Sequence, residues 1–204
     1  KEAEAAGVDG ILLVAPYYNK PSQEGLYQHF CAIAEATKLP VMIYNVPGRT
    51  GVNVNADTTL RLARIPNIVA TKDCAPTEQL TAIAAEAPSH FRVYSGDDSQ
   101  TLPAMAVGAH GIVSVASHIV GREMKRMIEA HVEGRPAEAA RLNQQLSPIF
   151  KGLFNCPHPV PNPVPVKYAL SHLGIIPTGA VRLPLVPLTD AEAAFVRNLL
   201  DNRK

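Results

Sequence analysis

The fold is decided by the stretch Asn67-Ile68-Val69-Ala70-Thr71-Lys72-Asp73-Cys74, a short apolar run that ends on a lysine. Residues 68–71 are nearly all apolar and rich in β-branched side chains, which indicates a buried strand of a parallel sheet. The residues that follow, from 73 to 77, are typical of a loop. The pattern therefore predicts that Lys72 stands at the carboxyl end of a strand, where parallel sheets and barrels place their chemistry.

The octapeptide leaves two interpretations of Lys72 open. A lysine held partly out of water loses some of its preference for the charged form, so that its neutral amine can attack a carbonyl near neutral pH. The alternative is a lysine at a strand end that reaches solvent or pairs with Asp73. The rest of the chain has to decide between a catalytic amine and a solvated one.

Strands and helices alternate on both sides of this stretch. The expected strands are residues 11–15, 41–45, 68–72, 91–95 and 112–115, and the expected helices are residues 22–37, 57–64, 77–87, 99–107 and 121–133. Ser22 is expected to open the first of these helices, and Thr77 is expected to cap the third. About five βα units in succession predict an α/β fold, with a parallel sheet and helices outside it.

The chain changes character after about residue 133, because no further strand is evident. Residues 137–154 have an amphipathic helical pattern, residues 155–165 form a proline-dense loop, and shorter helices are expected at 166–173 and from 189 to about 200. We therefore divide the chain into a partial β/α barrel, residues 1–133, and a C-terminal helical region, residues 134–204.

Composition excludes several classes of protein. The formal net charge of +1 provides no basic field for nucleic acid, and the apolar stretches are too short to cross a bilayer. Three widely spaced cysteines predict neither a disulfide framework nor a zinc site, and the seven histidines are scattered, so we assign no metal. We expect a cytoplasmic protein without a nucleic-acid or membrane partner.

Polar side chains gather at the ends of the expected strands. Tyr17 and Tyr18 follow the first strand, Tyr44 lies near the end of the second, and Arg49 is in the loop after it. A tyrosine near Lys72 can pass protons, and an arginine can hold a carboxylate with a bidentate fork. Together they describe a Schiff-base enzyme that acts on a keto acid. Taken singly, the two adjacent tyrosines are as typical of a packed aromatic pair, and the arginine of a solvated loop.

Four motifs of this chain resemble the dihydrodipicolinate synthase family. They are VAPYYNKPSQEGLY at residues 14–27, YNVPGRTG at 44–51, SGDD at 95–98 and NPVPVK at 162–167. The likeness runs from end to end. It implies a TIM (β/α)8 barrel, mostly found as a homotetramer, that condenses pyruvate with L-aspartate 4-semialdehyde on the route to lysine and diaminopimelate. We expect no cofactor.

The resemblance also implies roles for individual residues. Lys72 would form the imine with pyruvate, and Tyr44 would be the proton relay. Tyr18 would complete the relay by reaching into the active site of a neighbouring subunit. Arg49 would hold the carboxylate of the aldehyde substrate, and this arginine is absent from the corresponding loop of sialic acid lyases, which are otherwise similar here.

Two further positions follow from the resemblance. Val113 falls where the family contacts bound pyruvate through its backbone, and Tyr17 corresponds to a tyrosine near the lysine feedback site of inhibited members. Whether lysine inhibits this protein is left open.

The chain departs from the family pattern in two places. It supplies five of the eight strands, so we expect an N-terminally truncated barrel that lacks its first three βα units and is followed by the C-terminal helical region. Residues 156–161 look like a short insertion before the NPVPVK motif. Two alternatives to the synthase therefore stay open: a sister class I aldolase or lyase of 2-keto acids, and a catalytically incomplete fragment.

Overall fold

The computed structural model describes residues 1–202, and the chain divides into two compact units at Val113 and Ser114. None of the helices in the described residues is long and apolar enough to cross a membrane. The expected domain boundary after residue 133 stays a prediction, because compactness does not test which residues belong to a barrel.

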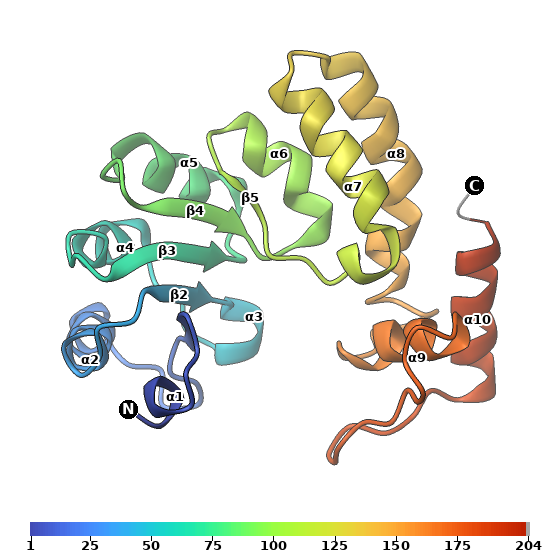
Figure 1. Ribbon diagram of the computed structural model, residues 1–204, viewed down its shortest axis with the longest axis horizontal. Coiled ribbons are helices and arrows are strands. Elements are labelled where there is room, and N and C mark those ends of the chain that lie inside the picture. The colour runs from blue at the N-terminus through green and yellow to red at the C-terminus, as the bar shows by residue number, and fades with distance from the viewer. Residues whose placement is uncertain (203–204) are drawn as a thin grey trace. The chain divides into compact units, whose positions relative to one another are not determined.

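The first unit is built on one parallel sheet (Figure 1). Its strands are β1 (Ile11–Val14), β2 (Val41–Asn45), β3 (Ile68–Asp73), β4 (Arg92–Ser95) and β5 (Gly111–Ile112), and they lie in the order in which they occur in the sequence. All four pairings are parallel. This sheet confirms the expected α/β class and four of the five expected strands to within one residue.

The helices between the strands largely follow the predictions. They are α1 (Glu2–Ala5), α2 (Gln23–Glu35), α3 (Pro47–Thr50), α4 (Ala56–Leu62), α5 (Thr77–Glu86), the 3-10 helix η1 (Asp98–Gln100) and α6 (Thr101–Ala106). The Ser22 side chain caps α2 by accepting a hydrogen bond from the Gly25 amide at 3.2 Å, as expected. Thr77 is not the cap of α5: the N-cap is Pro76, and the Thr77 hydroxyl donates to Gln100 instead.

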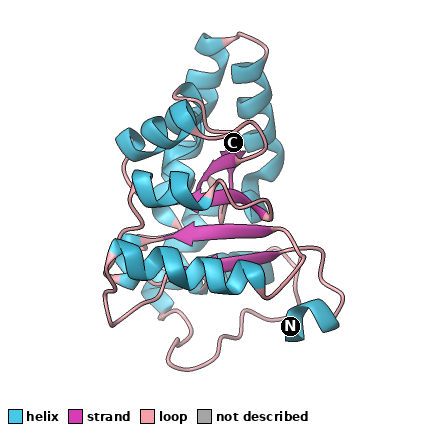
Figure 2. Ribbon diagram, turned by 90° about the vertical axis from the view of Figure 1, so that its left-hand side faces the viewer, coloured by secondary structure: helices cyan, strands magenta, loops and turns pink. Residues whose placement is uncertain are grey.

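The hydrophobic core of this unit lies between one face of the sheet and the helices that run along it (Figure 2). Val41 and Ile43 of β2 are fully buried there together with Phe30 of α2, Leu62 of α4 and Ile83 of α5. Since alternate residues of a strand point to opposite faces, these contacts fix which side chains face the helices. The residues between them face the other side of the sheet.

The structure corrects three details of the first unit. The expected loop at residues 46–55 contains the one-turn helix α3, which starts at Pro47 and is closed by Gly51 in the left-handed conformation (φ 74°). The last strand ends at Ile112 instead of residue 115, because only Tyr94 and Ser95 of β4 pair with it. The expected helix at 99–107 begins as 3-10 helix η1 and continues as α6.

The second unit contains helices in its described part and no strand beyond an isolated bridge between Asn155 and Pro159. The helices are α7 (Ser117–Val132), α8 (Pro136–Gly152), α9 (Val164–His172) and α10 (Asp190–Asp201). Helix α7 starts before the expected residue 121 and has a kink at Val120. Helix α9 starts before the expected residue 166, since proline is tolerated in a first turn.

The segment 156–161, expected to be an insertion, is anchored within the second unit. Cys156 is fully buried in a cluster with Val196 and Leu200 of α10. His158 Nε2 lies 2.9 Å from Glu192 Oε1 at the start of the same helix, where Thr189 and Glu192 form a capping box. These contacts tie the segment to α10.

Candidate active site

Lys72 and Tyr44 are brought together by the register of the sheet. They are cross-strand partners of β3 and β2, and one row of partners continues to Val14 on β1 and to Tyr94 on β4. Both side chains point to the face away from the helices, and Lys72 Nζ lies 4.3 Å from the centroid of the Tyr44 ring. The predicted amine and the predicted proton carrier are therefore neighbours on one face.

Lys72 is half-buried, and its surroundings favour the neutral amine. Burial is the main cause that lowers the pKa of Lys72, and the guanidinium of Arg49 lowers it further. The nearby side chains of Cys74 and Asp98 act in the opposite direction. The net lowered pKa means that a larger fraction of the amine is neutral at a given pH than for a solvated lysine.

Tyr44 keeps its proton, which it needs in order to donate one. Burial is the largest cause that raises its pKa, followed by Cys74, to which it is also hydrogen-bonded. Burial likewise raises the pKa of the Cys74 thiol to about 11, so this side chain is neutral near pH 7. No role for Cys74 was predicted from the sequence, and the structure places its side chain beside the tyrosine.

Gly96 leaves the space that the Lys72 side chain occupies. A Cβ atom at residue 96 would lie 2.4 Å from Cys74 Sγ and 2.9 Å from Lys72 Cε. Both distances are shorter than van der Waals contact, so any other residue would displace the lysine or the thiol. In the sequence this glycine stands out only as part of the SGDD motif, and its steric role was not predicted.

Asp73 does not pair with Lys72, which removes one of the alternatives considered from the sequence. It follows Lys72 in β3, and its side chain therefore points to the opposite, helix-facing side of the sheet, where it is fully buried. Its carboxylate accepts hydrogen bonds from Asn45, Gln79 and the Ala75 amide.

The remaining predicted residues lie at the rim of the site or apart from it. Arg49 is exposed on α3, and its charge affects both Lys72 and Tyr44. Val113 directly follows β5, and its amide donates to the Ser95 carbonyl at 2.9 Å. Tyr17 and Tyr18 are 70% and 92% exposed, and no ring contact joins them within residues 1–202, so they are not a packed pair.

Tyr18 stands out by its backbone as well as by its exposure. Its φ angle is 71°, in the left-handed region that non-glycine residues seldom adopt. Its side chain is 92% exposed and makes no ring or cation–π contact with Tyr44 or Lys72 within residues 1–202. The loop therefore holds the tyrosine outward.

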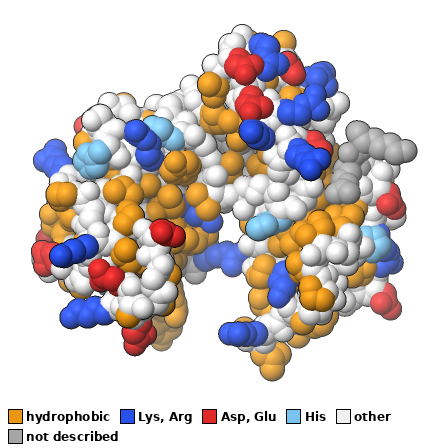
Figure 3. Space-filling view, viewed as in Figure 1, with side chains coloured by type: hydrophobic (Ala, Val, Ile, Leu, Met, Phe, Trp, Pro, Cys, Tyr) orange, Lys and Arg blue, Asp and Glu red, His pale blue; other side chains and the backbone are white. Residues whose placement is uncertain are grey.

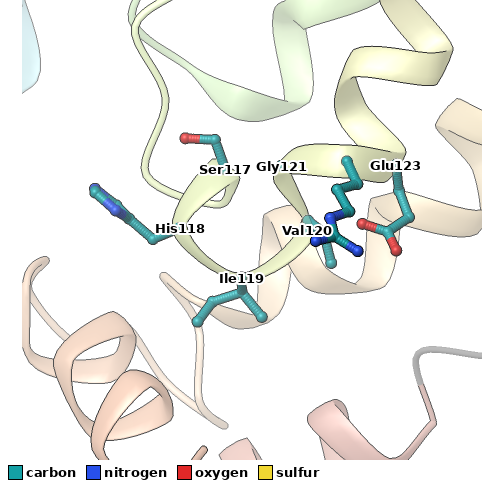
Figure 4. Close-up of a pocket in the computed structure, with 7 residues that line it drawn as sticks. Ser117, His118, Ile119, Val120, Gly121 and Glu123 are labelled. Carbon is teal, nitrogen blue, oxygen red and sulfur yellow. The ribbon is translucent and has the colours of Figure 1, made fainter. Parts of the chain in front are cut away.

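The two aspartates of the SGDD motif form no metal site in the described residues. The Asp97 side chain caps η1 by accepting a hydrogen bond from the Ser99 amide. No three His, Cys, Asp or Glu side chains gather around a metal position in this part of the chain. A hollow of about 520 Å³ in the second unit is lined by residues 117–123 (Figure 4). It contains none of the predicted site residues.

Lysine, arginine and acidic side chains are interspersed on the face shown in Figure 3.

A model of the dihydrodipicolinate synthetase family matches residues 1–203 of this chain. The chain belongs to the dihydrodipicolinate synthetase family. A family member from Bacillus subtilis, the 4-hydroxy-tetrahydrodipicolinate synthase of strain 168, is 57% identical over 194 residues, which cover 94% of this chain and 65% of that protein. The chain thus spans about two thirds of the length of the curated family members it matches.

Solved structures of the family share the fold. Dihydrodipicolinate synthase from Bacillus anthracis is 52% identical, with a TM-score of 0.93 over 98% of this chain and 67% of that one. The enzyme from Acinetobacter baumannii, solved in complex with pyruvate, is 43% identical, with a TM-score of 0.90 over 98% and 68%. The one from Cyanidioschyzon merolae, solved with lysine bound, is 44% identical, with a TM-score of 0.93 over 99% and 67%.

Proposed function

We propose that this protein condenses pyruvate with L-aspartate 4-semialdehyde to 4-hydroxy-tetrahydrodipicolinate, as a class I aldolase-type lyase of lysine and diaminopimelate biosynthesis. The observation that carries the proposal is the half-buried Lys72 amine, with its lowered pKa, 4.3 Å from the ring centroid of Tyr44. The names of the relatives at 51–57% identity support the choice of reaction. The likeness to the Acinetobacter baumannii enzyme solved in complex with pyruvate supports the first substrate.

Lys72 would act as the nucleophile. Its neutral amine adds to the ketone carbon of pyruvate, and loss of water from the carbinolamine leaves the imine. Removal of a proton from the methyl carbon converts the imine into an enamine, whose carbon attacks the aldehyde. The amino group of the bound product then adds to the imine carbon and expels the Lys72 amine as the ring closes.

Tyr44 would move the protons in these steps. Its hydroxyl keeps its proton near neutral pH, because burial and Cys74 raise its pKa, and it lies beside the amine that needs a proton donor. It can therefore supply a proton to the departing hydroxyl of the carbinolamine and take one back later. Tyr18, held outward at 92% exposure, would complete the relay in the site of a neighbouring subunit.

Arg49 and Val113 would hold the substrates. The exposed Arg49 guanidinium would bind the carboxylate of the aldehyde with a bidentate pair of hydrogen bonds. The backbone at Val113, at the end of β5, would contact pyruvate. Tyr17, 70% exposed, would lie near a lysine-binding site, and the likeness to a lysine-bound relative supports lysine as an inhibitor.

The proposal extends to the architecture and the setting of the protein. The five parallel strands would be part of an eight-stranded barrel, with residues 1–133 contributing to the barrel and residues 134–204 to a C-terminal helical region. The agreement over about two thirds of each solved chain supports this. We propose a homotetramer in the cytoplasm, and the three free cysteines fit a reducing compartment.

A turnover assay with a substrate panel tests the proposal. The full-length protein is incubated with pyruvate and L-aspartate 4-semialdehyde, and the cyclic product is followed by mass spectrometry. The matched reactions contain pyruvate with another aldehyde, or a longer 2-keto acid alone. Product from the semialdehyde is expected to form fastest. Cleavage of a longer keto acid without condensation of the semialdehyde would assign the sister lyase reaction instead.

A further inference from the structure

We propose that Asp73 is a positioning residue: its buried carboxylate fixes the ends of β2 and β3 so that Tyr44 and Lys72 face each other. The inference rests on the proposed function, since it concerns the geometry of the same lysine and tyrosine. It assigns a role to a group on the opposite face of the sheet, which does not point toward the substrates.

The positions of Asp73 and Asn45 follow from the strand register. Asn45 and Asp73 are cross-strand partners, one residue beyond the pair Tyr44 and Lys72. Side chains alternate between the faces of a sheet, so Asn45 and Asp73 point to the helices, whereas Tyr44 and Lys72 point to the face away from the helices. Asn45 and Asp73 are both 0% exposed. Each reacting side chain is thus followed in the chain by a buried polar one.

All three hydrogen-bond partners of the Asp73 carboxylate are N–H donors. Its Oδ1 accepts from Asn45 Nδ2 at 2.9 Å and from the Ala75 amide at 2.7 Å. Its Oδ2 accepts from Gln79 Nε2 at 2.9 Å. An ionised carboxylate accepts hydrogen bonds and donates none, so these three N–H groups match its charged form. The cavity is therefore built for a carboxylate and fits an amide poorly.

Further hydrogen bonds extend from Asp73 to the loop that follows Arg49 and α3. Asn45 donates to Asn53 Oδ1 at 2.7 Å, and Asn53 donates to Gln79 Oε1 at 2.8 Å. Gln79 also donates to the Val54 carbonyl at 2.9 Å. We call Asn45, Asn53, Asp73 and Gln79 the Asp73 network. It joins β2, β3, α5 and this loop, and so connects the segments that carry Tyr44, Lys72 and Arg49.

Backbone hydrogen bonds also hold the strand ends that carry Tyr44 and Lys72. The Cys74 amide donates to the Asn45 carbonyl, and the Gly96 amide donates to the Asp73 carbonyl, both at 2.9 Å. The strand ends that carry Tyr44 and Lys72 are thus held by the Asp73 side chain from the helix face and by these amides along the sheet edge. Misplacement of a reacting group by about 1 Å can cost about 100-fold in rate, so loss of the network should be visible in the chemistry.

The test is the Asp73→Asn variant, which keeps the size of the side chain but turns an NH2 group toward donors. The full-length protein is mixed with saturating pyruvate, reduced with borohydride at timed intervals, and the adduct on Lys72 is counted by mass spectrometry. We expect the maximal rate of adduct formation to fall about 10- to 100-fold. The pyruvate concentration that gives half the maximal rate should change little, because the carboxylate does not bind pyruvate.

Two further variants separate positioning from a general loss of structure. Gln79→Met removes one donor to Asp73 at a partly exposed position and serves if Asp73→Asn does not fold; a loss of about 10-fold is expected. The control is Asn67→Leu, which removes partly buried hydrogen bonds to the Ala34 and Thr37 carbonyls, just before the start of β3 and outside the Asp73 network.

Each outcome decides between the claims. An unaltered protein that forms no adduct overturns the proposed function and this inference with it. An adduct in the unaltered protein, with a folded Asp73→Asn variant forming it equally fast, overturns only the positioning role. If Asp73→Asn does not fold, Gln79→Met is read in its place. Asn67→Leu as slow as the tested variant in folded protein also overturns the positioning role, because the loss would then reflect stability. A slow tested variant with a normal Asn67→Leu supports the inference.

Discussion

The Nζ atom of Lys72 lies 4.3 Å from the centroid of the Tyr44 ring, and the two residues are cross-strand partners of a parallel sheet. Their backbones are therefore set by the hydrogen bonds of the sheet and not by a loop. A charged ammonium at this distance from the ring is attracted to it, whereas the neutral amine is free to attack. The cation–π contact thus holds the charged lysine beside the tyrosine, and the cross-strand pairing keeps the two residues neighbours in both protonation states.

Gly96→Ala should abolish imine formation with pyruvate. The new methyl group would overlap Cys74 Sγ and Lys72 Cε, so the lysine has to move from its place beside Tyr44. The matched control is Gly121→Ala, whose added methyl group has its nearest neighbour at 3.9 Å and which should retain the rate. Borohydride trapping of both variants measures the difference. Normal trapping in Gly96→Ala would show that the glycine is not needed for space.

Tyr44→Phe should slow the reaction by about 10²- to 10⁴-fold, because the ring stays while the proton carrier is lost. Pre-steady-state measurement of imine formation and of turnover gives the step that is affected. The retained ring still packs against the lysine, so the fold should be unchanged by circular dichroism. A turnover equal to that of the unaltered protein would remove Tyr44 from the relay.

The rate of imine formation should rise with pH and level off below pH 10.5, the ordinary pKa of a lysine, because burial lowers the pKa of Lys72. The sign follows from the neutral amine being the nucleophile: a lowered pKa moves the rise to lower pH. Rates measured from about pH 6 to about pH 11.5 at saturating pyruvate test this. A midpoint at or above 10.5 would contradict the effect of burial.

Replacing the amine should also change stability in a pH-dependent way. The folded protein disfavours the charged form of Lys72, so this residue costs stability where the unfolded chain binds the proton, below pH 10.5. Lys72→Met should therefore raise the thermal unfolding midpoint at pH 7, and the gain should shrink as the pH approaches 10.5. An equal gain at both pH values would assign it to packing alone.

Arg49→Ala should weaken the use of the aldehyde while leaving the pyruvate imine intact. The guanidinium is exposed on α3 and is proposed to bind the second carboxylate. Steady-state kinetics with each substrate varied in turn should show a higher KM for the semialdehyde. Arg49→Lys keeps the positive charge but not the two parallel N–H donors of the guanidinium. The KM of this variant for the semialdehyde should lie between those of the unaltered protein and Arg49→Ala. Impaired trapping with pyruvate alone would place the arginine elsewhere.

Local sequence patterns were enough to predict most strands and helices of the first unit. The apolar run of β3 and its terminal lysine are continuous in the sequence. The alternative pairing of Lys72 with Asp73 was wrong, because β3 continues through Asp73 and its side chain therefore points to the opposite face. The one-turn helix α3 was missed, although Pro47 and Gly51 are the residues that start and stop it. A single turn offers no hydrophobic period to detect.

The supporting groups of the site could not be predicted from sequence, because they depend on contacts between distant residues. Asn53 and Gln79 are 26 residues apart, and nothing in either neighbourhood marks them as partners. Gly96 limits the space around Lys72 only because β3 and β4 are neighbours in the sheet. The residues that carry chemistry have recognisable types, whereas the residues that hold them are ordinary amides and glycines.

The central claim is that Lys72 forms a Schiff base with pyruvate, and peptide mapping tests it directly. The full-length protein is reduced with borohydride in the presence of pyruvate, digested, and sequenced by tandem mass spectrometry, with Lys72→Ala as the control. A pyruvyl adduct on Lys72, absent from the variant, is the predicted result. An adduct on another lysine, or a folded protein without any adduct, would contradict the claim.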